Sequence, residues 1–286
     1  MVKSIVMAGG KVRKNISDLE KKITDKYYKD KYLLGKGYKP LKRVKLKRNS
    51  EKKPLIHYVL STLGQTPLIE DITIVGEKDR LEKFLESQDY KKPVKVIQQK
   101  GGFLENALIG YQESCAKNHS LFVASDIPKI TSFSIKDFLK RCHGRSDFYF
   151  PIIGWETGII NKKRPALKLL DTSPKKQENV YDKYGRRGFR IGNMIYTNPN
   201  KIKNKEFVDL AYNVRKLLIP KNLWTIYKYM SPEIKKYRKK QLSINDLELK
   251  ASKILDSKFK LIETYSTEIE EDIDSESDIK NLENEI

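Results

Sequence analysis

Short apolar runs alternate with helix-like segments along the first half of the chain, and this alternation limits the fold more than any other feature. Residues 3–8, 72–75, 94–97 and 121–124 are apolar runs of the length and composition of buried strands. Segments with helical spacing follow them, at 54–63, 78–86, 105–116 and from about residue 134. This order is typical of a mostly parallel sheet with helices on both faces. We therefore expect a three-layer α/β/α fold with a parallel, doubly wound sheet.

The second half of the chain continues with both kinds of segment. Strand-like runs occupy 148–153, 165–170, 186–196 and 258–262, and helix-like runs occupy 202–218, 223–230, 243–255 and 277–284. We expect one domain over residues 1–286. In it, residues 12–53 form a mobile basic insertion, 198–256 a helical elaboration, and 257–286 a returning strand, an acidic motif and a last helix.

The chain is strongly basic, with 58 Lys and Arg against 37 Asp and Glu and a net charge of +21. Because residues 263–285 are acidic, the rest of the chain is more basic than the total indicates. Such a charge attracts nucleic acid, anionic lipid or small phosphorylated substrates. The alternative explanation is a lysine-rich composition whose surface lysines bind no partner.

Membrane and disulfide classes are not indicated. No apolar run approaches the roughly 20 residues of a membrane span, and the first residues lack the apolar segment of a secretion signal. Cys115 and Cys142 have no metal-ligand spacing, so the sequence predicts neither a disulfide framework nor a zinc site. We expect a cytoplasmic protein without a membrane partner.

Asp126 follows directly after the strand-like run 121–124, in the sequence Ser-Asp-Ile-Pro. Ligands bind at the carboxyl ends of strands in open α/β sheets. A carboxylate there can hold a hard cation against phosphate oxygens. The alternative is that Asp126 opens a turn or caps the helix near Ser134, because Asp-x-Pro is a common turn sequence.

Two glycine-containing loops follow strand-like runs. Gly9 and Gly10 come after the first run and precede several cations, so that the backbone there could approach a phosphate closely. The second loop, residues 98–106, could place four residues against a base or ribose through backbone and amide hydrogen bonds: Gln98, Gly101, Gly102 and Asn106. It could equally be a tight turn at a helix start.

Seven short motifs in order carry a resemblance to a known family. They are AGG at 8–10, KPL at 39–41, KPLI at 53–56, GGFLEN at 101–106, SDIP at 125–128, GN at 192–193 and DID-x-x-x-D at 272–278. Together they resemble the MobA-like NTP transferases, which are nucleotidyltransferases with a GT-A-like, Rossmann-related fold, and most closely the uncharacterised bacterial and archaeal members. In molybdenum cofactor guanylyltransferases and in sialic acid and Kdo cytidylyltransferases, similar motifs serve transfer of NMP to a phosphate or hydroxyl.

The resemblance implies an enzyme that depends on Mg²⁺ or Mn²⁺. It would transfer NMP from an NTP to a phosphorylated or hydroxyl acceptor and release pyrophosphate. Asp126 matches the first metal-binding aspartate, and Asp272 and Asp274 match the late aspartates that complete the site. Aspartates two residues apart in extended chain point the same way. Alternatively, these two form an acidic patch that caps the final helix.

The resemblance also assigns the phosphate contacts. The residues implied for the β- and γ-phosphates are Ala8, Gly9, Gly10, Lys11 and Arg13. Lys39 is the best match for the catalytic lysine on the α-phosphate, because the insertion has stretched the family's compact loop. Lys14 and Lys45 remain alternatives.

The remaining implied residues lie near the base and the acceptor. Gly102, Glu105 and Asn106 match the segment near the base. Asn193 matches a position near the acceptor or metal, although an asparagine that satisfies a strand end is an equally ordinary explanation.

A second function class is a non-catalytic relative that binds nucleotide or RNA through the basic surface. Such a module has no need to keep Asp126 together with Asp272, and its aromatic residues would form a stacking pattern that this sequence lacks. The sequence therefore favours the enzyme, whose partners would be a nucleoside triphosphate and a small acceptor. It leaves open whether the protein forms a homodimer.

Overall fold

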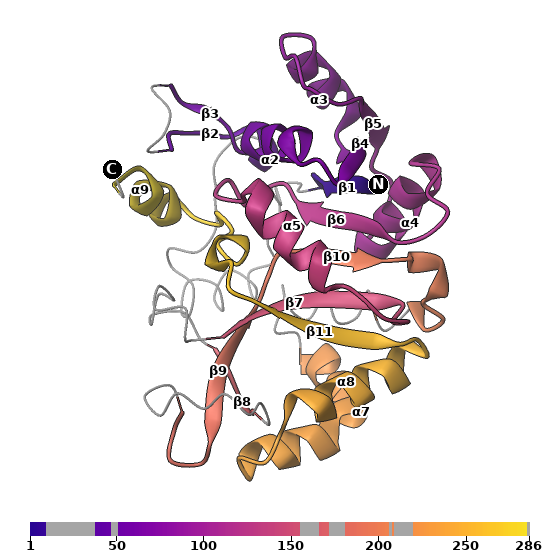
Figure 1. Ribbon diagram of the computed structural model, residues 1–286, viewed down its shortest axis with the longest axis vertical. Helices are drawn as coiled ribbons and strands as arrows, with labels where there is room; N and C mark the ends of the chain where they lie inside the picture. The colour runs from indigo at the N-terminus through magenta and orange to yellow at the C-terminus, as the bar shows by residue number, and fades with distance from the viewer. Residues whose placement is uncertain are drawn as a thin grey trace.

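The computed structural model describes residues 1–9, 38–46, 51–154, 166–171, 181–205, 208 and 220–284. Within them, nine strands form one mixed sheet (Figure 1). The strands are β1 Val2–Met7, β4 Ile69–Gly76, β5 Val94–Gln98, β6 Ser120–Ala124, β7 Phe148–Gly154, β8 Leu167–Leu170, β9 Arg186–Ile191, β10 Met194–Thr197 and β11 Phe259–Thr264. The helices are α2 Leu55–Gln65, α3 Lys78–Leu85, α4 Phe103–Glu113, α5 Ser132–Arg141, α7 Pro220–Arg238, α8 Ile244–Leu255 and α9 Glu276–Asn284. The predicted α/β class is confirmed.

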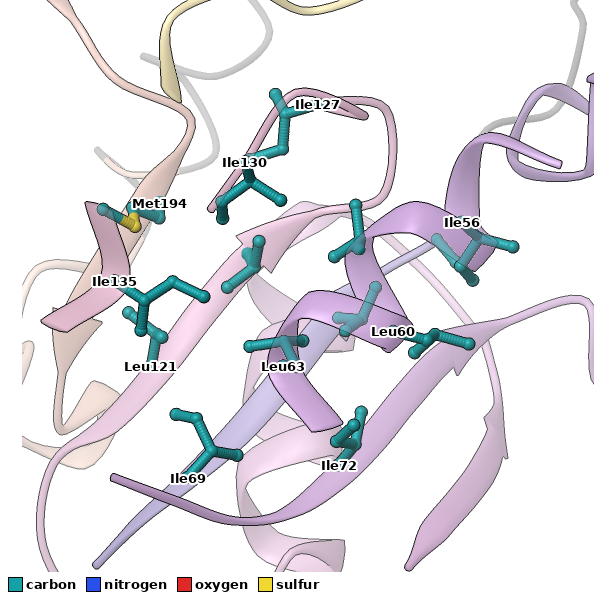
Figure 2. Close-up of a cluster of buried hydrophobic side chains, with 14 of the residues drawn as sticks. Ile56, Leu60, Leu63, Ile69, Ile72, Leu121, Ile127, Ile130, Ile135 and Met194 are labelled. Atoms are coloured by element: carbon teal, nitrogen blue, oxygen red, sulfur yellow. The ribbon is translucent and has the colours of Figure 1, made fainter. Parts of the chain in front are cut away.

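Strands β5, β4, β1 and β6 lie side by side and are parallel. Helices α2, α3 and α5 pack on one face of this part of the sheet, and α4 packs on the other. Figure 2 shows the hydrophobic core between the sheet and helices α2 and α5. In it, Ile56, Leu60 and Leu63 of α2 pack against strand residues such as Ile72 and Leu121. The apolar alternation seen in the sequence is therefore the packing pattern of a three-layer structure.

The run predicted as one strand at 186–196 forms two strands, β9 and β10, which follow one another across a bend at Gly192-Asn193. Both β9 and β10 pair antiparallel with β7, whose other edge is taken by the parallel strand β11. Ile191 lies opposite Ile152 and Tyr196 opposite Tyr149, so the bent run carries extra residues over this length. This is a β-bulge at Gly192-Asn193. Beyond it, β10 pairs with β6, whereas before it β9 pairs with β8.

A glycine lies at the bulge, where a side chain would have little space. Gly192 donates its N–H to the Pro151 carbonyl at 3.0 Å, and a Cβ at this position would lie 2.8 Å from the Ile269 side chain. The close passage of residue 269 over the bulge brings the C-terminal segment to the end of β6.

Two smaller features complete the description. Helix α8 packs on β11 and α7, on the side of the sheet away from β1. Of the predicted helix 202–218, residues 206, 207 and 209–218 lie outside the described residues. Among the described helices, none combines the length and apolarity needed to cross a membrane.

Candidate active site

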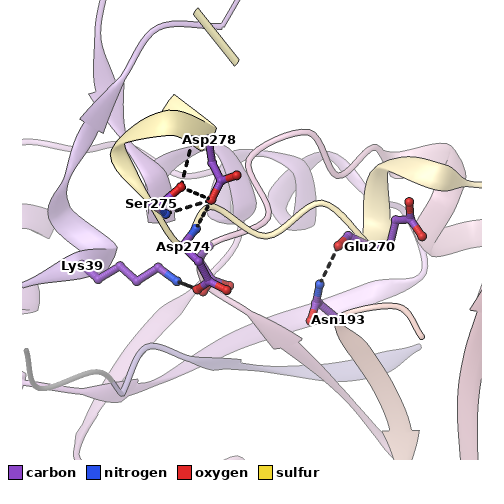
Figure 3. A network of polar contacts seen from close by, with 7 residues as sticks. Lys39, Asn193, Glu270, Asp274, Ser275 and Asp278 are labelled. Carbon is purple, nitrogen blue, oxygen red and sulfur yellow. Dashed lines mark hydrogen bonds and ion pairs between the residues drawn. The ribbon is translucent and has the colours of Figure 1, made fainter. Parts of the chain in front are cut away.

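A lysine and two carboxylates meet at the carboxyl ends of β1 and β6. Lys39 Nζ lies 2.5 Å from Asp126 Oδ2. It also lies 2.6 Å from Asp274 Oδ1, as Figure 3 shows. Lys39 begins the short 3-10 helix η1, Lys39–Leu41, while Asp126 follows β6 and Asp274 precedes α9. Three distant parts of the sequence thus supply one cluster, and all three residues were predicted site residues.

Backbone hydrogen bonds place residues 269–274, the acidic segment before α9, over the end of β6. The Ile273 N–H donates to the Asp126 carbonyl at 3.0 Å, and the Asn193 N–H donates to the Ile269 carbonyl at 2.7 Å. The Asn193 side-chain amide donates to the Glu270 carbonyl at 3.2 Å, as Figure 3 shows. Asn193 thus joins the bulge to the acidic segment, and in turn its own carbonyl accepts from Ala124 N–H.

The last aspartate of the DID-x-x-x-D motif takes part in the N-terminal cap of α9. Asp278 Oδ2 accepts from the backbone N–H groups of Ser275 at 2.8 Å and Asp274 at 3.0 Å, while Ser275 Oγ accepts from Asp278 N–H. This reciprocal arrangement is a capping box. It fixes the backbone of Asp274 and leaves the Asp274 carboxylate directed at Lys39 (Figure 3).

Helix α9 is docked on the hairpin that follows Lys39. The hairpin consists of β2 Arg43–Val44 and β3 Lys53–Pro54. Ile279 and Leu282 of α9 pack against Val44 and Tyr58, and Glu283 pairs with Lys52 at 2.8 Å. Lys45, the alternative to Lys39, contributes its backbone N–H to Glu283 here. This packing holds the lysine helix and the late aspartates together.

The charge on Lys39 is fixed by its surroundings. Burial lowers the pKa of the Lys39 ammonium, but the nearby charges of Asp126 and Asp274 outweigh that effect and raise the pKa above its ordinary value. Lys39 is therefore a cation over the whole neutral range.

The donor set suits a hard cation only in part. Asp126 and Asp274 converge on one positive charge, and carboxylate oxygens are the ligands that Mg²⁺ and Mn²⁺ prefer. Asp272 is placed by its N–H, which donates to the Glu270 carbonyl at 3.2 Å. In the part of the chain that the structure describes, no three acidic, His or Cys side chains are arranged to hold a metal together. The structure thus brings together two of the three predicted ligands.

One alternative for Asp126 does not hold. Helix α5 is capped by Thr131, whose Oγ1 accepts from the Ser134 N–H at 3.1 Å, in a capping box. Because Asp126 is not the cap of this helix, its carboxylate is available to the cluster with Lys39.

The glycine loop after β1 is described as far as Gly9. A Cβ on Gly9 would lie 3.0 Å from Gln99 Oε1, so the loop passes close to the end of β5. The Ala8 N–H donates to the Val75 carbonyl, and the Ala8 carbonyl accepts from the Tyr38 hydroxyl. The predicted residues Gly10, Lys11 and Arg13, and the alternative Lys14, lie outside the described residues.

A cavity of about 340 Å³ lies beside this loop, at the carboxyl ends of β4 and β5. Its lining residues are Glu77, Lys78, Asp79, Arg80, Gln98 and Gln99. Sequence reasoning missed most of them, although polar residues directly after two strands were a visible signal.

The second glycine loop is held by an asparagine. Asn106 is 7% exposed; its Oδ1 accepts from Lys100 N–H at 2.8 Å and its Nδ2 donates to the Gly101 carbonyl at 3.1 Å. Gly102 is the N-cap residue of α4, and the Glu105 carboxylate folds back over Gly101. The Asn106 side chain therefore fixes the conformation of the loop, while Gly102 and Glu105 lie where the loop enters α4.

Solved structures share this architecture. A hypothetical transferase from Thermus thermophilus matches with a TM-score of 0.66 at 21% identity, over 97% of this chain and 99% of that one. A CMP:2-keto-3-deoxy-manno-octonic acid synthetase in complex with CTP matches with a TM-score of 0.52 at 11% identity, over 99% and 96%. HddC from Yersinia pseudotuberculosis, in complex with GMP-PN, matches with a TM-score of 0.52 at 14% identity, over 100% and 99%.

The chain has the fold of these proteins. At such low identities the likeness extends to the fold alone. No protein-family model matches the sequence, and no curated protein matches it significantly.

Proposed function

We propose that this protein is a metal-dependent nucleotidyltransferase of the MobA-like kind. It transfers NMP from an NTP to a phosphorylated or hydroxyl acceptor. The observation that carries the proposal is the convergence of Asp126 and Asp274 on the Lys39 ammonium, at the edge of the sheet where α/β folds bind their ligands. The fold shared with a CTP-bound synthetase and a GMP-PN-bound protein supports it.

In this reaction, an acceptor oxygen forms a bond to the α-phosphorus while the bond to the bridging oxygen of pyrophosphate breaks. The electron pair leaves with pyrophosphate. Negative charge therefore grows on the α-phosphoryl and leaving-group oxygens, and fixed positive charge stabilises it.

Asp126 and Asp274 would hold the Mg²⁺ or Mn²⁺, with Asp272 as the third predicted ligand. The bound ion would supply neutralisation of the triphosphate. Since Mg²⁺ usually keeps several waters and phosphate oxygens, two or three protein carboxylates suffice. Lys39 stays protonated and lies within reach of the same place, so it can bind an α-phosphate oxygen.

The other predicted residues would position the nucleotide. Gly9 and Gly10, with Lys11 and Arg13, would receive the β- and γ-phosphates, and the adjoining cavity has a size suited to a base or ribose. Gly102, Glu105 and Asn106 would border the base, and Asn193 would face the acceptor.

Pyrophosphate release tests the proposal. Each of the four NTPs is supplied with Mg²⁺ and a pool of phosphorylated sugars, polyols and pterins. We expect release that needs one NTP, one acceptor and Asp126. Asp126→Asn is the test variant, and Asp89→Asn is the control because Asp89 is an exposed carboxylate away from the site.

Two results would contradict the proposal. One is absence of release with every pair. The other is equal release by wild type and Asp126→Asn. Absence of release together with RNA binding that weakens steeply with salt would instead identify the binding protein.

A further inference from the structure

We propose that Tyr38 is the positioning residue for Lys39, and that its hydroxyl ties the catalytic lysine to the ends of two strands at once. The inference deepens the proposed function and rests on it for the role of Lys39. Tyr38 lies in no motif that the sequence analysis singled out.

The Tyr38 hydroxyl makes two hydrogen bonds to different strand ends. It donates to the Ala8 carbonyl after β1 and accepts from the Glu77 N–H after β4, at 3.1 Å. Tyr38 is only 5% exposed, so water does not compete for these groups. The phenol thereby links the glycine loop after β1 to Glu77, one of the residues that line the adjoining cavity.

A glycine makes room for this hydroxyl. A Cβ on Gly76 would overlap the Tyr38 hydroxyl, would lie 2.7 Å from the Leu81 side chain and would lie 3.1 Å from the Ala8 carbonyl oxygen. The last residue of β4 therefore has to lack a side chain for the phenol to enter. Tyr38 and Gly76 form a matched pair.

The backbone between Tyr38 and the lysine is rigid. The Tyr38 carbonyl accepts from Leu41 N–H at 3.0 Å, and the Lys39 carbonyl accepts from Lys42 N–H at 3.0 Å. Pro40 is buried and fixes its own φ angle. The Lys42 carbonyl then accepts from Leu55 N–H at the start of α2.

Two neighbouring side chains therefore reach three strands. Tyr38 bonds at the ends of β1 and β4, and Lys39 bonds at the end of β6 through Asp126. A lysine side chain is flexible, so the position of the Lys39 ammonium depends on where its backbone is held as well as on its two ion pairs. The Tyr38 hydroxyl holds the neighbouring backbone through its hydrogen bond to the glycine loop after β1.

The first test measures Lys39 directly, without substrate. Wild type and Tyr38→Phe are treated with an amine-acetylating reagent, and labelling rates are read by mass spectrometry. We expect Lys39 to label about tenfold faster in Tyr38→Phe, which corresponds to the loss of one or two ordinary hydrogen bonds. Lys92, which donates to the Thr66 and Ile69 carbonyls, is the internal reference and keeps its rate.

A matched variant controls for loss of a buried phenol. Tyr111 is 3% exposed and donates its hydroxyl to the Asn118 carbonyl at 2.6 Å, on α4. Tyr111→Phe should leave Lys39 labelling at the wild-type rate. If Tyr38→Phe proves too unstable, Gly76→Ala displaces the phenol from the opposite side and should give the same faster labelling. Unchanged Lys39 labelling in the folded test variant overturns the proposal.

The second test uses turnover, once a substrate pair is found. Tyr38→Phe should lower kcat about tenfold and cause no further loss in a Lys39→Ala background, because it acts through the lysine. Losses that multiply in the double variant would overturn the positioning role. If wild type releases no pyrophosphate with any pair, the proposed function fails, while the labelling result still decides whether Tyr38 holds Lys39.

Discussion

The sheet has a parallel half, made of β5, β4, β1 and β6, and a second half, made of β7, β8, β9 and β11. The two halves bury different kinds of side chain. In the parallel half, Ile5, Val6 and Ile74 lie in the strands and are fully buried among apolar neighbours. In the other half, β9 buries Arg187 and Arg190. One half is held by apolar packing, and the other also contains ion pairs within its core.

The buried arginines are paired with acidic residues from other segments. Arg187 lies 2.9 Å from Asp171 and 2.8 Å from Glu263, with its guanidinium over the Phe189 ring. Arg190 lies 2.8 Å from Glu270, which is 3% exposed at its side chain. Glu270 belongs to the segment that Asn193 holds, so the ion pair also anchors the acidic segment.

The difference separates stability from chemistry. In the parallel half, the charged residues of the candidate site lie at the carboxyl ends of the strands, and we expect their replacement to affect function more than folding. Where charges lie inside the sheet, removal of one partner leaves the other buried without compensation. The predictions below test this division.

The largest effect is expected on activity at Asp126. Asp126→Asn should lower pyrophosphate release by about 10³-fold or more, because the carboxylate charge that holds the cation is lost. Its melting temperature should stay within about 2 °C of wild type, which corresponds to about 1 kcal/mol or less for a chain of this length. Calorimetry beside the activity assay checks both; an unfolded variant would show that the site also carries the fold.

Arg190→Met should have the largest effect on stability. We expect a loss of about 3–5 kcal/mol in the free energy of unfolding, since the Glu270 carboxylate stays buried without the arginine. Urea unfolding measures it. The double variant Arg190→Met with Glu270→Met should regain most of that loss; a single variant within 1 kcal/mol of wild type would show that the pair is dispensable.

Lys39→Ala should raise the activation barrier by about 3 kcal/mol, or roughly 10²-fold in kcat, as is usual when one charge-stabilising group is removed. Lys42 is the matched control, because it is a nearby lysine paired with Glu276 at the surface. Lys42→Ala should change kcat less than about twofold. Steady-state kinetics decides, and equal effects of the two variants would remove the assignment of Lys39.

The smallest effect is expected on stability, at the N-terminal cap of α8, the helix that packs on β11. The Lys236 ammonium and the Ser243 N–H bond to the Asp246 carboxylate and lower its pKa to about 2. Because the folded-state pKa is depressed, the stabilisation is present above the unfolded pKa of about 3.9 and is lost as pH falls towards 2.

Comparison with Asp246→Asn measures this charge effect. At pH 7 the wild type should be more stable by about 1 kcal/mol, and about half of that difference should remain at pH 3. Thermal unfolding at both pH values tests it. A difference that does not change with pH would assign the effect to hydrogen bonding alone.

The strands of the parallel half could be predicted because their evidence is local. Apolar runs at 3–8 and 121–124 report burial on both faces, and the structure has β1 and β6 there. Asp126 could be singled out for the same reason, since its position depends only on where β6 ends. The strand-like run at 186–196 was also visible, but its bend and its change of partner from β8 to β6 were not.

The sequence by itself determined the α/β class, the order of its strands and helices, and the polar residues at strand ends, because these follow from the periodicity of neighbouring residues. Only the tertiary structure decided that Asp274 meets Lys39 and that Tyr38 joins β1 to β4. These contacts link residues that are far apart in the chain. The position of Asp274 depends on the hydrogen bonds of Asn193 to residues 269 and 270 and on the docking of α9, and no local pattern encodes either.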